Sequence, residues 1–196
     1  MTEAHITREE LHHRRIDMRG FCRSDGLYEV EASVVDRKYQ AFEPLMGGKQ
    51  VAIGEPLHDM GVTVVFDAHM QVHDVRTFTR SAPYDICPEG GRALQSLIGL
   101  RMTTGWNKEV RDRLGGSKSC THLMELLGPL ATTAFQTTSA LRRKLPAPVD
   151  AAGRPLKIDS CYAYGAEREL VRMHWPQFHR PAAESGSDRS ANRDAP

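Results

Sequence analysis

The sequence predicts an α+β fold in which an antiparallel sheet is followed by a helical segment with one long C-terminal helix. Residues 27–35, 57–66 and 70–78 alternate apolar and polar side chains, which is typical of half-buried strands. Residues 92–145 instead repeat apolar side chains at the spacing of an amphipathic helix. Strands grouped before helices favour an α+β arrangement over alternating βα units.

Three strands are expected in the first half of the chain. The first, 27–35, follows the turn pair Asp25-Gly26. The next two, 57–66 and 70–78, are separated by three residues only, so we expect them to pair as an antiparallel hairpin.

Helical spacing then predicts helices over 92–100, 106–114 and 120–145. Gly128-Pro129 lies inside the last of these, and we expect it to kink or split that helix. A final strand pair, 156–164 with 169–175, is expected around Gly165.

The length of 196 residues suits one full-sized domain. We expect a flexible N-terminus over 1–11 and a single α+β domain over 12–180. A linker-like loop rich in proline is expected at 146–155. Residues 181–196 carry small, polar and charged side chains with proline, a composition that predicts disorder.

The charge balance excludes some classes of partner. With 26 basic and 25 acidic residues the formal net charge is +1, which gives no electrostatic argument for nucleic acid or for a membrane surface. No apolar run approaches the roughly 20 residues that span a bilayer, and no secretory signal is recognisable. We therefore expect a cytoplasmic protein with reduced thiols, whose partner is a small molecule or a metal. A homo-oligomer is left open.

Three short stretches place reactive side chains beside turn residues: 54–60, 83–88 and 115–123. An antiparallel hairpin brings the start of its first strand beside the end of its second, so His58 and Cys87 are expected to be neighbours. If the last helix packs back across the sheet, Cys120 joins them. A mixed donor set of this kind suits Zn²⁺ or iron. The predicted metal ligands are His58, Asp59, Cys87 and Cys120, with His122 in reserve.

The same residues also allow thiol chemistry. Cys120 begins a predicted helix, where backbone N–H groups and the helix dipole favour a thiolate. It is then a nucleophile, with His122 or His58 as its base. Three arginines near the N-terminus are candidates for holding an anionic substrate, although an exposed charge cluster is the better explanation: Arg15, Arg19 and Arg23. The other two cysteines, Cys22 and Cys161, are interpreted as structural.

Several motifs together resemble a bacterial family catalogued as a domain of unknown function, number 2889. The resemblance covers roughly residues 12–178 and departs at Ser119, where the family more often has glycine. It implies no activity. The motifs are 13–16, 19–32, 54–60, Pro83-Tyr84 with Cys87, 120–127 and 131–136.

The layout is also similar, more distantly, to the NifU/IscU-type iron–sulfur scaffold. That resemblance rests on Gly54-x-Pro56-x-His58, on Cys87 after the hairpin, and on Cys120-x-x-Leu123 opening a helix. It implies a NifU/IscU-like core and an iron–sulfur cluster or single metal ion. His58 stands where that family has its first cysteine, and Cys87 and Cys120 match the second and third. Met60 and Ser119 depart from the family's aspartate and histidine.

Three functions follow as hypotheses. The first is a metal-binding cytoplasmic protein that holds zinc or iron in a Cys/His site. The second is a metal- or thiol-dependent enzyme acting on a small anionic substrate, with Cys120 or a bound metal as the reactive centre. The third is a binding module whose cysteines are structural only.

Overall fold

A computed structural model of the chain describes residues 6–45 and 47–181. The chain divides into two compact units, Met1–Arg142 and Arg143–Pro196, which are treated separately below. The division falls close to the predicted linker-like loop at 146–155, and the predicted single domain over 12–180 extends across it. The predicted disordered tail lies outside the described residues from position 182 onward, as do the first five residues.

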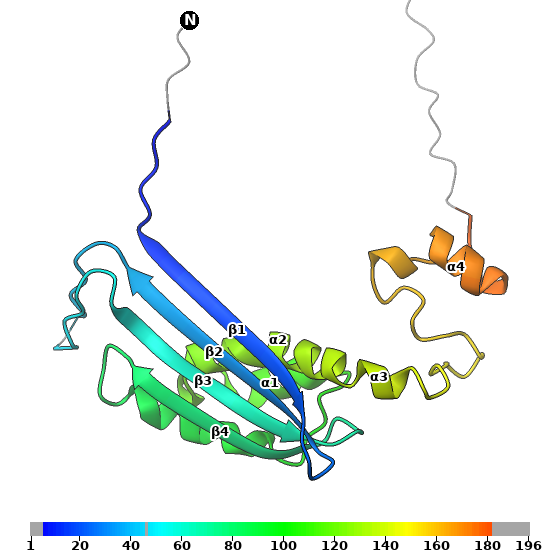
Figure 1. Ribbon diagram of the computed structural model, residues 1–196, viewed down its shortest axis with the longest axis horizontal. Coiled ribbons are helices and arrows are strands. Elements are labelled where there is room, and N and C mark those ends of the chain that lie inside the picture. Colours follow the sequence, from blue (N-terminus) through cyan, green and yellow to red (C-terminus); the bar gives the residue numbers. More distant parts are fainter. Residues whose placement is uncertain (1–5, 46, 182–196) are drawn as a thin grey trace, which may run out of the picture. The chain divides into compact units, whose positions relative to one another are not determined.

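The first unit contains a four-stranded antiparallel sheet in the order β1-β2-β3-β4 (Figure 1). The second to fourth strands correspond to the three predicted ones, so the α+β class is confirmed. Side chains alternate along each strand, and one set faces the helices while the other set faces away. The strands are β1 (His12–Cys22), β2 (Tyr28–Lys38), β3 (Pro56–Phe66) and β4 (Val72–Ser81).

The strand β1 was not expected from the sequence. It pairs with β2 along its whole length, from His12 opposite Lys38 to Cys22 opposite Tyr28. Most of its side chains are exposed, so it lacks the apolar alternation that reveals a strand in a sequence. Pairing with β2 and polar contacts to neighbouring elements hold it in place.

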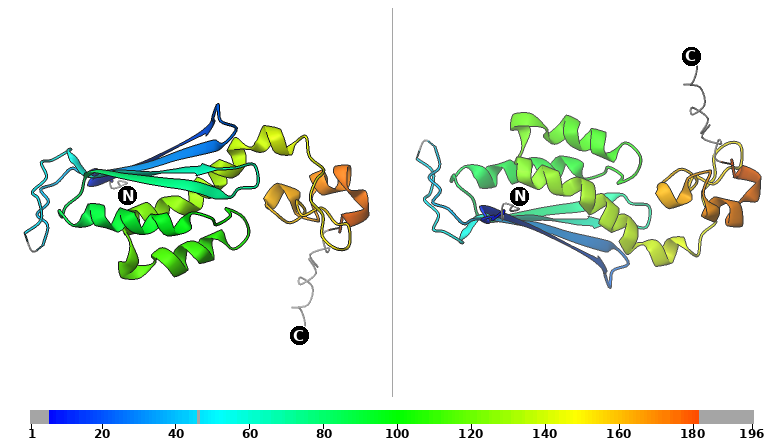
Figure 2. Two further views of the ribbon diagram at one scale, coloured as in Figure 1. Left: turned by 90° about the horizontal axis from the view of Figure 1, so that it is seen from below. Right: turned by 90° about the horizontal axis from the view of Figure 1, so that it is seen from above.

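The helices of the first unit lie on one side of the sheet, where η1 and α2 pack against it and α1 packs on those two (Figure 2). The predicted helix 92–100 is a 3₁₀ helix that begins earlier. The predicted helix 106–114 is confirmed. The elements are η1 (Cys87–Leu97), α1 (Trp106–Leu114), η2 (Gly116–Lys118), α2 (Thr121–Thr137) and α3 (Ser139–Arg142).

The long helix α2 runs through Pro129 without being split there. Its interruption comes at Thr138, between α2 and α3. Three of its leucines, at 126, 127 and 130, are fully buried in the core against the sheet. Packing of this apolar face outweighs the loss of one backbone hydrogen bond at proline. Among the described residues, no helix combines the length and apolar character required to cross a bilayer.

The second unit is a short helical segment with its own small core. It contains η3 (Tyr162–Tyr164), α4 (Glu169–His174) and η4 (Pro176–Phe178). The predicted final strand pair, 156–164 with 169–175, is therefore wrong. Val171 of α4, Trp175 at the break after it and Phe178 of η4 pack together with Ile158 and Ala166.

We predict that Leu127→Ala destabilises the chain by about 2–5 kcal/mol, because it leaves a cavity where α2 meets the sheet. Thr132→Ala, on the exposed side of the same helix, is the matched control and should change stability by less than about 0.5 kcal/mol. Urea unfolding followed by circular dichroism measures both. Equal effects would contradict the placement of Leu127 in the core.

Candidate functional site

A buried carboxylate lies at the centre of a polar cluster between the sheet and α2. Asp36, near the end of β2, is 1% exposed. The register places Arg14 of β1 opposite it on one side and His58 of β3 on the other. Arg14 donates two hydrogen bonds of 2.8 Å, from Nε to Oδ1 and from Nη2 to Oδ2. His58 Nδ1 lies 3.0 Å from Oδ2.

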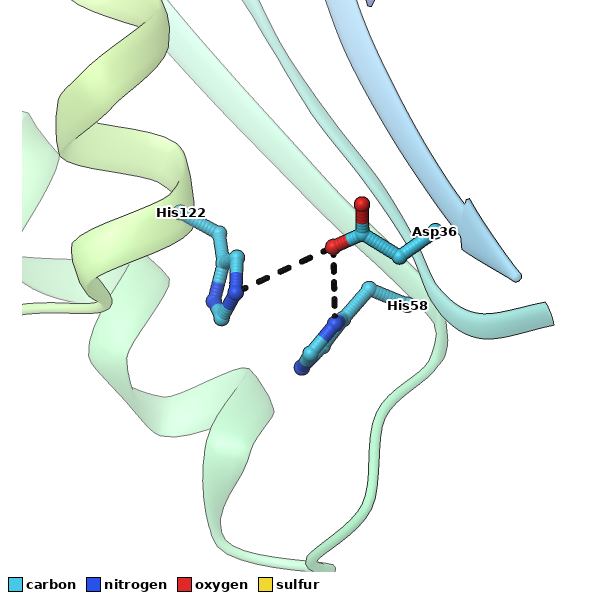
Figure 3. Close-up of side chains that lie close together, drawn as sticks. All are labelled: Asp36, His58 and His122. Atoms are coloured by element: carbon cyan, nitrogen blue, oxygen red, sulfur yellow. Dashed lines mark hydrogen bonds and ion pairs between the residues drawn. The ribbon is translucent and has the colours of Figure 1, made fainter. Parts of the chain in front are cut away.

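The first turn of α2 adds a second imidazole (Figure 3). The ring of His122 stacks on that of His58 with centroids 3.9 Å apart, and its Nε2 lies 3.9 Å from Asp36 Oδ2. His12 approaches from the other side, with Nε2 3.3 Å from Oδ1. Residues from three strands and a helix therefore surround one carboxylate.

Cys120 is the N-cap residue of α2, as predicted. Its N–H donates to Gly90 O at 3.3 Å, and its Sγ lies 3.6 Å from Met60 Sδ. A Cβ at position 90 would come within 2.8 Å of the Cys120 nitrogen, so the close approach of η1 requires glycine. The thiol is half-buried, and His122 follows it by two residues in the first turn of α2.

Asp36 and His58 are each held in one protonation state. Burial acts to raise the pKa of Asp36, but the hydrogen bonds from Arg14 and His58 outweigh it and lower the pKa to about 2. Burial, followed by repulsion from His122, lowers the pKa of His58. At neutral pH His58 is thus uncharged, and with Nδ1–H donated to Asp36 its Nε2 is a free acceptor.

Cys120 and His122 shift in opposite directions. Burial acts to raise the pKa of the Cys120 thiol, yet its hydrogen bonds with His122 and with the backbone N–H of Leu123 bring the pKa below the ordinary value. The pKa of His122 is raised, chiefly by its hydrogen bond with Cys120. These directions favour a thiolate–imidazolium pair at the helix N-terminus.

The structure brings together only some of the predicted metal ligands. His58 joins the cluster, but Asp59 projects from the opposite face of the sheet, where Arg80 Nη1 lies 3.4 Å from its Oδ1. Cys87 opens η1 and is half-buried. Among residues 6–45 and 47–181, the group of three metal-ligating side chains whose donor atoms all lie within 4.8 Å of one another is Asp36, His58 and His122.

The three arginines predicted to hold substrate lie apart from this cluster. Arg15 and Arg19 are on the sheet face that the helices leave uncovered, where Arg15 pairs with Asp17 and Arg19 lines a shallow hollow. Arg23, beyond the far end of β1, pairs with Asp25 and Glu29.

Asp36 and Arg14 were missed in the sequence. A signal existed for Asp36, because Val30, Ala32 and Val34 alternate onto the buried face and position 36 continues that series. A carboxylate at a buried strand position requires a partner. Arg14 gave no comparable signal, because its strand was not predicted.

Fold and cluster define an α+β protein with a Cys/His/Asp centre between a sheet and a helix N-terminus. A family model described as "Protein of unknown function (DUF2889)" matches residues 12–136. The chain belongs to this family. No curated protein and no solved structure matches it.

Asp36→Asn should lower the free energy of unfolding by about 3 kcal/mol at pH 7, because it leaves Arg14 without its buried counter-charge. The folded-state pKa of about 2 lies below the ordinary 3.8, so this stabilisation is present above pH 4 and is lost as the pH falls towards 2. A shift of this size corresponds to about 2 kcal/mol. Urea titrations of both proteins at pH 7, 4 and 2.5 measure it, and a pH-independent difference would contradict the assignment.

Proposed function

We propose that this chain is a thiol-dependent enzyme in which Cys120 is the nucleophile. One observation carries the proposal: the Cys120 thiol lies at the start of α2, and His122, in the first turn of the same helix, stacks on an imidazole oriented by Asp36. A nucleophile, a base beside it and a third group that orients a base form the pattern expected of covalent catalysis. This proposal corresponds to the second hypothesis from the sequence, a thiol-dependent enzyme with Cys120 as the reactive centre.

The two imidazoles suit different proton transfers. The Cys120 thiolate attacks an electrophilic carbonyl carbon, and His122 gives its proton to the leaving group, so that a thioester forms on Cys120. Water then attacks the thioester. His58 accepts the proton of that water at Nε2, because Asp36 holds its Nδ1–H. The thiolate departs, and the carboxylic acid product is released.

Metal binding is a second candidate, favoured by the three donors within 4.8 Å. Two histidines and one carboxylate suit zinc or non-haem iron. A more specific version of the metal-binding candidate is an iron–sulfur scaffold role of the NifU/IscU kind. Arg14 weighs against it, because this guanidinium occupies both oxygens of Asp36. Its positive charge also opposes a cation at the same carboxylate.

If the proposal holds, iodoacetamide alkylates Cys120 rapidly at a pH where an ordinary thiol is protonated. The structural reason is the imidazolium of His122, which stabilises the thiolate. Mass spectrometry resolves alkylation rates between pH 5 and 9, with exposed Cys22 in the same chain as the reference thiol. In His122→Gln the Cys120 profile should move to higher pH.

His69→Gln alters an exposed histidine of the β3–β4 turn and is the matched control, whose profile should stay unchanged. Turnover is tested with 4-nitrophenyl acetate. Cys120 should be transiently acetylated in the unaltered chain and remain acetylated in His58→Gln, as seen by intact mass. A Cys120 that reacts no faster than Cys22 and never acylates would sink the proposal.

The metal candidate predicts one equivalent of zinc or iron in protein purified anaerobically without a histidine tag. His58→Ala and His122→Ala should each abolish it, since either removes a donor nitrogen. His69→Ala is the control. Metal analysis by inductively coupled plasma mass spectrometry, with acid-labile sulfide, decides. Metal-free protein with an unreactive Cys120 would leave the binding-module hypothesis.

A further inference from the structure

The strand β1 forms an open edge of the sheet. Among the described residues it pairs with β2 alone, whereas η1 and the segment after it run beside the other edge strand, β4 (Figure 1). Its eleven residues pair with β2 in continuous register, without a bulge. An edge of this length is a template for a further strand.

The hydrogen bonds at the two ends of the β1–β2 pairing show which residues of β1 point their N–H and C=O groups away from β2. Tyr39 N donates to Leu11 O at one end, and Arg23 N donates to Leu27 O at the other. In an antiparallel pair the bonded residues alternate, so the odd-numbered residues of β1 bond to β2. The N–H and C=O groups that face outward therefore belong to the even-numbered residues, among them Ile16 and Met18 in the middle of the strand.

A second copy of β1, related to the first by a two-fold axis, can form hydrogen bonds with these same outward-facing groups. Centring on Arg15 or Asp17 sets that residue opposite its own copy, which places like charges together. Centring on Ile16 instead puts Arg15 opposite Asp17 of the other copy, twice. These opposite charges then occupy a pair without backbone hydrogen bonds, where side chains lie closest.

We infer that two copies of this chain associate through β1 in the register centred on Ile16, forming one continuous eight-stranded sheet. Edge charges ordinarily discourage pairing. Here they disfavour the registers centred on Arg15 and on Asp17. A register centred on Met18 would also pair Asp17 with Arg19, but Met18 already packs against the core, whereas Ile16 is exposed and gains more apolar burial on the axis. Ile16 is 48% exposed in a single chain and meets its own copy in the pair. The strand that pairs also carries Arg14, which holds Asp36.

Light scattering coupled to size-exclusion chromatography, at about 100 µM chain, tests the inference. The unaltered protein should be a dimer. Arg15→Asp should yield a monomer, because it sets two carboxylates opposite each other. The double variant Arg15→Asp/Asp17→Arg should dimerise again, since the swap restores both opposite-charge pairs. Asp74→Arg, a charge reversal on β4, is the control and should stay dimeric.

Ile16→Pro gives an independent result. It removes an outward N–H and leaves the odd-numbered bonds to β2 intact, so the folded chain should be monomeric. Far-ultraviolet circular dichroism establishes folding of each variant. The inference is overturned if the unaltered protein is a monomer. It is also overturned if Arg15→Asp remains a dimer, or if the double variant remains a monomer.

Discussion

The buried carboxylate of Asp36 is the interaction on which the arrangement of this end of the sheet depends. A carboxylate removed from water costs several kcal/mol unless charge and hydrogen bonds replace its hydration. Arg14 supplies a bidentate pair and His58 a further hydrogen bond. The same side chain thereby links β1, β2 and β3. This explains how β1, with few buried side chains, stays paired along its whole length.

The position of Cys120 is set by backbone packing. No side chain caps α2, and the Cys120 N–H is satisfied by Gly90 of η1. That contact requires glycine at 90, while the neighbouring Gly91 lies against Thr77 of β4. Behind them, Leu123 and Leu127 anchor α2 in the core. The thiol is consequently held over the sheet beside Met60 by the rigid parts of the fold, as a nucleophile on a defined trajectory requires.

A helix or strand could be predicted from the sequence where its buried face repeats apolar residues at regular intervals. The strands β2 to β4 and the helix α1 show this regular apolar pattern, and each was predicted. The edge strand β1 buries little, so pairing rather than amphipathicity defines it. In the second unit the segment before Gly165 holds too few apolar residues to separate a short helix from a strand.

The candidate site follows the same logic. Cys120, His122 and His58 could be predicted because reactive side chains stood at expected element ends. Asp36 continues the buried alternation of β2, but its partnership with Arg14 could not be predicted, because it exists only through the register of two strands, one of them unpredicted. Asp59 was misassigned for a related reason: adjacent residues on a strand face opposite sides, so only one of His58 and Asp59 can reach the helices.

The stacked imidazoles constrain the order of proton movements. Two cationic rings 3.9 Å apart repel each other, and burial lowers the pKa of His58 while the pKa of His122 is raised, so a proton on the pair favours His122. That proton is retained chiefly through the hydrogen bond with Cys120. When the thiolate becomes a neutral thioester, His122 loses this counter-charge and its pKa falls. In the proposed mechanism, acylation itself would therefore release the proton that the leaving group needs, and it would leave two neutral imidazoles of which only His58 is oriented by a buried carboxylate.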